Sequence, residues 1–94
     1  MRKLGIDMTV VSSPDVVSCD LAGETALLNL ASGTYYTLNP VATTVWCFIR
    51  EPRRVSDIHA LLLGRYEIEP EPCASDLLQF LAALSSNGLV EVHE

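Results

Sequence analysis

Residues 25–40, TALLNLASGTYYTLNP, decide the fold, because they predict two strands, the loop between them and the start of a helix. Thr25–Leu30 and Thr34–Leu38 are rich in residues that suit a pleated surface. Between them, Ala31-Ser32-Gly33 predicts a three-residue hairpin loop, since its glycine can adopt the left-handed conformation required at the last loop position. Asn39-Pro40 predicts a helix N-terminus, with the asparagine as N-cap and the proline at the first helical position.

The segments before this stretch also favour extended structure. Val16–Asp20 can form a strand, and Leu21-Ala22-Gly23 is a second loop that ends in glycine. The two loops lie ten residues apart, so they predict a three-stranded antiparallel meander. Thr9-Val10-Val11 is a further short extended start, and residues 1–8 are expected to form a flexible N-terminus.

Two helices are predicted directly after the meander. The first ends at Glu51-Pro52, because a proline disfavours helix at the residue before it. Ser56 is expected to cap the second helix. The apolar residues recur at helical spacing in both: Val41, Val45, Trp46 and Ile49 in the first, and Ile58, Leu61, Leu62 and Tyr66 in the second.

A third helix is expected to begin at Pro70 or Pro72. Gly88 ends it in a left-handed conformation, and Leu89 packs back on Leu84 as in a Schellman motif. Leu89–Val92 is a short extended tail. The predicted fold class is therefore α+β, a three-stranded antiparallel sheet followed by three helices in a winged helix-turn-helix-like arrangement.

Length and composition limit the possible functions. The chain has 94 residues, of which 49% are hydrophobic, so we expect one domain with a packed core, residues 1–94. Six basic residues against twelve acidic ones give a net charge of −6, which argues against a nucleic-acid partner. We find no apolar run near the roughly 20 residues of a membrane span, no secretory signal and no cysteine framework. We therefore expect a cytoplasmic protein without a membrane partner.

No group of residues predicts catalysis. A Cys/His pair needs a thiolate, a base within reach and a group that orients the base. Cys19, Cys47 and Cys73 are each interpreted as small, partly buried apolar residues, and His59 and His93 as solvated side chains. The sequence contains no CxxC, HxxxH or HExxH motif and no glycine-rich phosphate loop. We predict no enzymatic activity, no metal and no cofactor.

The winged helix-turn-helix prediction raises the possibility of DNA binding, which the charges oppose. The helix that would enter the major groove, residues 71–86, contains no Lys and no Arg. The arginines at positions 50, 53, 54 and 65 gather around the turn between the first two helices. They are interpreted as a solvated loop, with an acidic partner as the alternative.

The strand Thr34–Leu38 offers a different function, because it is the last strand of the meander and hence an edge. Edge strands are usually blunted with Lys, Pro or charge, and this strand has none of these. Either another element covers the edge or a peptide adds there as a further strand. By strand parity, Thr34, Tyr36 and Leu38 share one face, and Tyr35 and Thr37 share the other.

A run of short motifs resembles the PqqD-like family, whose members are known as RiPP recognition elements. The motifs are Leu27-Leu28-Asn29-Leu30, Ser32-Gly33-Thr34-Tyr35-Tyr36, Leu38-Asn39-Pro40, Val45-Trp46, Asp76-Leu77-Leu78, Phe80-Leu81 and Leu84 through Gly88-Leu89-Val90. The similarity spans about residues 9–92. It implies a winged-helix-like fold that binds the leader region of a ribosomally made precursor peptide.

The resemblance also implies where the leader binds and which proteins act with this chain. In the family the leader lies as an added strand on the third strand, in a groove walled by the third helix. The candidate peptide-binding residues are therefore Thr34, Tyr35, Tyr36, Thr37, Leu38, Asp76, Leu77, Phe80, Ala83 and Leu84. Within the family the chain looks most like the stand-alone leader-binding proteins of lasso-peptide pathways. Their partners are a separate cysteine-type leader peptidase and a cyclase. The alternatives are a peptide chaperone for a radical-SAM or other modifying enzyme, and an orphan protein–protein interaction domain.

Overall fold

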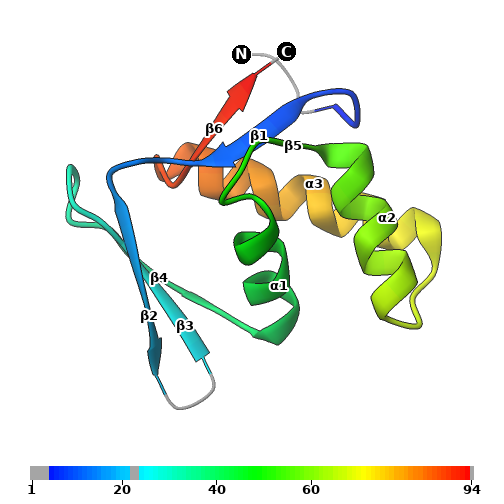
Figure 1. Cartoon of the computed structure of the whole chain (residues 1–94), viewed down its shortest axis with the longest axis horizontal. Coiled ribbons are helices and arrows are strands. Elements are labelled where there is room, and N and C mark those ends of the chain that lie inside the picture. The colour runs from blue at the N-terminus through cyan, green and yellow to red at the C-terminus, as the bar shows by residue number, and fades with distance from the viewer. Residues whose placement is uncertain (1–4, 22–23, 94) are drawn as a thin grey trace.

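The computed structural model describes residues 5–21 and 24–93 of the chain. The elements in chain order are β1 (Thr9–Ser12), β2 (Val16–Leu21), β3 (Glu24–Asn29), β4 (Tyr35–Leu38), α1 (Pro40–Phe48), β5 (Arg53–Arg54), α2 (Val55–Arg65), α3 (Pro70–Ser86) and β6 (Val90–His93). Figure 1 shows the β2, β3 and β4 strands on one side of the molecule and α2 on the other. Helix α1 lies between them, and α3 runs across behind α1.

The predicted meander is confirmed as an antiparallel sheet with the order β2-β3-β4. Leu27 of β3 lies opposite Ser18 on one side and Tyr36 on the other. Its side chain is fully buried, whereas Leu28, on the other face of the strand, is 36% exposed. One face of the sheet therefore packs on the core and the other faces solvent.

The loop between β3 and β4 has one residue more than predicted. The register places Asn29 opposite Thr34, and the Asn29 amide donates to the Thr34 carbonyl at 2.9 Å, which leaves a loop of four residues, Leu30–Gly33. Gly33 has a φ of 75°, so its predicted left-handed conformation is confirmed. The loop is longer because the Asn29 side chain binds two loop amides, those of Ala31 at 2.9 Å and Ser32 at 3.4 Å.

The other predicted loop, Leu21-Ala22-Gly23, can be compared with the structure only at its first residue. Leu21 is the last residue of β2 and pairs with Glu24 of β3. Ala22 and Gly23 lie outside the described residues.

A second sheet, with the order β5-β1-β6, pairs a strand near the start of the chain with a strand near its end. The extended segments at Thr9–Val11 and Leu89–Val92 were both predicted, but their pairing was not. Val10 lies opposite Val92 of β6 and Arg53 of β5 and is fully buried. The sequence gives no signal for β5, because it is only two residues long and depends on a distant partner.

Helix α1 begins as predicted and ends earlier than predicted. The Asn39 side chain accepts a hydrogen bond from the Ala42 amide at 2.8 Å, which confirms the N-cap, and Pro40 is the first helical residue. The helix ends at Phe48 rather than at Glu51. The Ile49 carbonyl accepts a hydrogen bond from the Ser12 amide of β1 at 2.8 Å, so a tertiary contact fixes the backbone where the helix would have continued.

The predicted Ser56 cap of α2 is wrong. The helix begins one residue earlier, at Val55, and its N-cap is Arg54, which makes no side-chain capping bond. The Val55 and Ser56 amides donate instead to the Met8 and Ile6 carbonyls, at 2.9 and 3.0 Å. A backbone segment that precedes β1 thus takes the place of a side-chain cap.

Helix α3 confirms both of its predicted ends. It begins at Pro70, with Glu69 as N-cap. At its C-terminus the Leu89 amide donates to the Leu84 carbonyl at 2.9 Å, and the Gly88 amide donates to the Ser85 carbonyl at 3.1 Å. Gly88 has a φ of 69°, which completes a Schellman motif.

The core lies where the three helices meet the inner face of the meander and the second sheet. Its fully buried leucine and isoleucine side chains are Leu27, Leu38, Ile49, Ile58, Leu81, Leu84 and Leu89. The α+β class with a three-stranded antiparallel sheet and three helices is confirmed. Among residues 5–21 and 24–93 there is no helix of the length and hydrophobicity that crossing a membrane requires.

The two left-handed glycines should respond differently to substitution. Gly33→Ala should lower the free energy of unfolding by about 1 kcal/mol, because alanine pays only the cost of the left-handed backbone; no atom lies within 4 Å of the added Cβ. Gly88→Ala should cost clearly more, because its Cβ would lie 2.8 Å from Asn29 Nδ2. Urea denaturation measures both variants. Equal losses would show that the Gly88–Asn29 approach is not tight.

Candidate functional site

Strand β4 has one unpaired edge in the described part of the chain, since β3 is its only neighbour there. In an antiparallel ladder, hydrogen-bonded pairs alternate with non-hydrogen-bonded pairs. The Asn29–Thr34 bond sets this alternation, so the backbone groups of Tyr36 and Leu38 point toward β3. The N–H and C=O groups of Tyr35 and Thr37 point toward the open edge and can pair with a further strand.

The side chains of β4 follow the predicted parity. Leu38 is buried and Tyr36 and Thr34 are half-buried, all on the face toward the core. Tyr35 is 58% exposed and Thr37 is exposed, on the opposite face. A strand added to this edge would therefore extend the core-facing surface on one face and the solvent-facing surface on the other.

A pocket of about 600 Å³ lies between the start of α1, the end of α2 and the first half of α3. Most of its lining is apolar, and three carboxylate side chains complete it. The lining residues are Asn39, Val41, Ala42, Val45, Leu62, Tyr66, Glu67, Ile68, Glu69, Pro72, Cys73, Asp76, Leu77 and Phe80. Asn39 directly follows Leu38, so the end of β4 leads to the pocket.

Side-chain hydrogen bonds fix the walls of the pocket. The Tyr66 hydroxyl at the end of α2 lies 2.9 Å from the Thr44 hydroxyl of α1. His59 Nε2 of α2 lies 2.9 Å from the Pro70 carbonyl at the start of α3. His59 is less solvated than predicted, because its ring is half-buried and links α2 to α3. The three helices thus hold the pocket open before any ligand binds.

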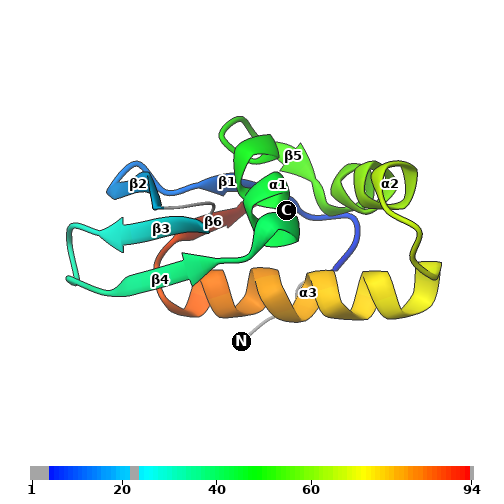
Figure 2. The ribbon, with the colours of Figure 1, turned by 90° about the horizontal axis from the view of Figure 1, so that it is seen from below.

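The structure divides the predicted site residues into three groups. Thr34, Tyr35, Tyr36, Thr37 and Leu38 form the end of the hairpin loop and the open edge strand. Asp76, Leu77 and Phe80 line the pocket. Ala83 is half-buried one turn further along α3, and Leu84 is fully buried in the core. In Figure 2 the strands follow one another as β2, β3 and β4, and α3 comes next on the β4 side.

Comparison with known protein families gives a match over most of the chain. The sequence profile of the family described as Coenzyme PQQ synthesis protein D (PqqD) matches residues 24–90. The chain belongs to the PqqD family. No curated protein sequence matches it.

Two solved structures of peptide complexes share the fold. TbiB1 in complex with the TbiA(β) leader peptide is 32% identical to this chain, with a TM-score of 0.79, and the match covers 86% of this chain and 94% of that one. Lasso peptide synthetase B1 complexed with the leader peptide is 22% identical, with a TM-score of 0.77, and the match covers 87% and 96% of the two chains. The predicted resemblance to the PqqD-like family is confirmed.

Sequence reasoning missed the part of the pocket that α1 and α2 supply. Val45 and Leu62 were predicted only as apolar residues at helical spacing; they join the core, and they also line the pocket. Val41 and Ile68 are 40% and 43% exposed, and both line it. Ile68 carried a usable signal, because an isolated isoleucine in a polar, proline-rich connection has no core to join.

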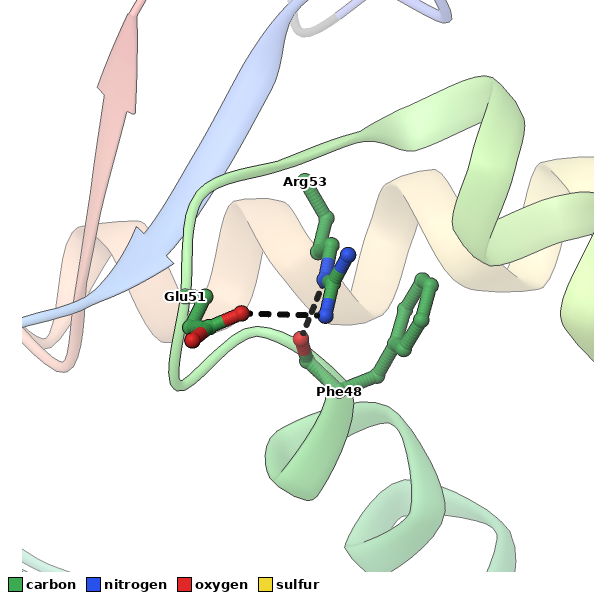
Figure 3. Close-up of polar contacts among 3 residues, drawn as sticks. All are labelled: Phe48, Glu51 and Arg53. Carbon is green, nitrogen blue, oxygen red and sulfur yellow. Dashed lines mark hydrogen bonds and ion pairs between the residues drawn. The ribbon is translucent and has the colours of Figure 1, made fainter.

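The arginine-rich turn has a structural role at Arg53 (Figure 3). Its guanidinium lies over the Phe48 ring, 4.5 Å from the centroid, and its Nε donates to the Phe48 carbonyl at 3.1 Å. It also forms an ion pair with Glu51 at 3.3 Å. Arg53 therefore holds β5 against the end of α1. The other three arginines, Arg50, Arg54 and Arg65, are exposed, as predicted.

The three cysteines differ in exposure. Cys19 and Cys47 are exposed, so the prediction that they are partly buried is wrong for both. Cys73 is buried and lines the pocket. Burial, and to a lesser extent the nearby Asp76 carboxylate, raises the pKa of the Cys73 thiol. A raised pKa keeps the thiol protonated at neutral pH and makes Cys73 a poor nucleophile.

The rates of alkylation should distinguish Cys73 from the two exposed cysteines. At pH 8, iodoacetamide should modify Cys19 and Cys47 at least about tenfold faster than Cys73, because only the thiolate reacts and Cys73 is both protonated and shielded. Cys73 should begin to react only as the pH rises above the usual range of a thiol. Mass spectrometry of the digested protein gives the three rates, and urea should make them similar. Equal rates in the folded protein would contradict the burial of Cys73.

Proposed function

We propose that this chain binds the leader region of a ribosomally synthesised precursor peptide, which adds as a strand to β4. The observation that carries the proposal is the open β4 edge, which leads at Asn39 to a largely apolar pocket. Strand addition takes affinity from backbone hydrogen bonds and specificity from side-chain pockets. The complex of the 32% identical TbiB1 with a leader peptide supports this function.

Each group of site residues has its own role in this proposal. The backbones of Tyr35 and Thr37 pair with the leader, and Thr34, Tyr36 and Leu38 hold the strand against β3. Leu77 and Phe80 receive apolar leader side chains from the α3 side, with Ala83 beside the path of the leader. Leu84 supports α3 from within the core, because its side chain is fully buried.

We further propose that the bound leader presents its precursor to a separate cysteine-type leader peptidase and to a cyclase, in a lasso-peptide pathway. The sequence resemblance supports this branch of the family. Holding the leader raises the local concentration of the attached core peptide at the peptidase, which requires no chemistry from the protein that holds it. The chain is then a recognition protein and not an enzyme.

Proline substitutions along β4 test strand addition. Thr37→Pro should raise the Kd for the leader of the precursor encoded beside this gene at least about fivefold, because a backbone bond contributes about 1 kcal/mol. Tyr35→Pro should do the same. Both variants should stay folded, since an edge strand tolerates proline on its free side. Tyr36→Pro should instead lower the Tm, because the Tyr36 amide belongs to the ladder with β3.

Thr37→Val is the matched control for this series, since valine keeps the backbone amide and the β-branched shape. It should bind the leader as the wild type does. Isothermal titration gives the affinities, and thermal unfolding gives the Tm. Unchanged affinity in folded Tyr35→Pro and Thr37→Pro would refute addition at β4.

A reconstituted cleavage assay tests the division of labour. The chain alone should leave the precursor intact, and it should accelerate cleavage by the separate peptidase. Thr37→Pro should lose this acceleration in proportion to its loss of leader affinity. Cleavage of the precursor by this chain in the absence of the peptidase would overturn the recognition role.

A further inference from the structure

All the charged side chains that line the pocket are negative. Glu67, Glu69 and Asp76 line it, and no Lys, Arg or His is among its lining residues. All three carboxylate side chains are exposed, so they form a rim around the apolar interior. Asp76 is close enough to the pocket-lining Cys73 for its negative charge to act on the thiol.

The chain offers these carboxylates no cation of its own among residues 5–21 and 24–93. The ion pairs there join Arg53 to Glu51 and His93 to Glu91, both away from the pocket. Glu67, Glu69 and Asp76 form neither an ion pair nor a side-chain hydrogen bond with another described residue. Three like charges around one opening repel each other, and a bound cation would relieve that repulsion.

The interior of the pocket is apolar, in contrast to its charged rim. Val41, Val45, Leu62, Ile68 and Phe80 present carbon surface from three helices and the connection between α2 and α3. Val41 and Ile68 expose 40% and 43% of their surface to solvent, which an apolar ligand side chain would cover. An apolar group beside a positive charge therefore fits the pocket better than either group alone.

We propose that the pocket recognises a leader segment in which an apolar side chain is accompanied by a Lys or Arg. The apolar side chain enters between α1 and α3, and the cation reaches the rim of Glu67, Glu69 and Asp76. This inference rests on the proposed function, because it assigns the pocket to the same peptide that pairs with β4. Asn39 joins the strand to the pocket, so the segment lies just beyond the paired part of the leader, at the Leu38 end of β4.

Neutralising the rim tests the proposal. The variant Glu67→Gln, Glu69→Gln, Asp76→Asn should bind the labelled synthetic leader of the precursor encoded beside this gene about tenfold more weakly, since exposed ion pairs contribute roughly two- to fivefold each. Its affinity should also depend less on NaCl between 50 and 500 mM than that of the wild type. Each single substitution should have a smaller effect of the same sign. Fluorescence anisotropy measures the affinities, and circular dichroism checks the fold.

A matched control distinguishes the effect of the three rim carboxylates from the effect of the net charge of −6. The variant Asp7→Asn, Asp15→Asn, Glu24→Gln removes the same charge from exposed positions that do not line the pocket. It should bind the leader as the wild type does. An equal loss of affinity in this control would overturn the proposal, because general attraction to an acidic protein would then explain the effect.

Leader variants identify the cation. A set of leaders is made, each with a single Lys or Arg replaced by Gln. One of them should bind the wild-type protein about tenfold more weakly than the unchanged leader does. The same replacement should change binding to the rim-neutralised variant little. The proposal is overturned if the rim-neutralised variant binds as tightly as the wild type, or if the leader has no Lys or Arg and still binds. These outcomes leave leader binding itself intact. Failure of the wild type to bind any of the leaders refutes the proposed function instead.

Discussion

The buried side chain of Asn29 is the contact on which the arrangement of this protein depends. Its Nδ2 donates to the Asn87 and Gly88 carbonyls at the end of α3, at 3.1 and 3.2 Å. Its Oδ1 accepts from the Ala31 and Ser32 amides of the hairpin loop. One amide group therefore joins the β3–β4 hairpin to the third helix. The Asn29 side chain is buried, so leaving its own amide group without partners would cost about 1–3 kcal/mol.

This junction explains how a small domain can offer a preformed peptide site. The same four-residue loop leads directly into β4, so the Asn29 contacts set where the open edge lies relative to α3. At the other end of β4, the Asn39 cap begins α1 and fixes the first wall of the pocket. The Thr44–Tyr66 and His59–Pro70 contacts fix the remaining walls. A leader would meet an edge and a pocket that need little reorganisation, which limits the entropy cost of binding.

The sequence predicted best those local features that depend only on residues adjacent in the chain. The Asn39 cap, the left-handed Gly33 and the Schellman end at Gly88 each follow from a few adjacent side chains, and all three were predicted. The errors have a common cause in long-range contacts. Ser56 lost its capping role to the carbonyls of Ile6 and Met8, α1 stopped where Ser12 binds Ile49, and β5 exists only because β1 passes beside it. For the same reason, β4 and the α3 residues Asp76 and Phe80 were named in advance, but the α1 and α2 walls of the pocket were not.

Amide hydrogen exchange measured by NMR, with and without the leader, tests the central claim most directly. The claim is that a peptide pairs with the open edge of β4. Leader binding should then slow exchange at the Tyr35 and Thr37 amides, which point away from β3. The Tyr36 and Leu38 amides should be protected already and should change less. Slower exchange confined to α2 and α3, with the Tyr35 and Thr37 amides still exchanging freely in the complex, would contradict strand addition at β4.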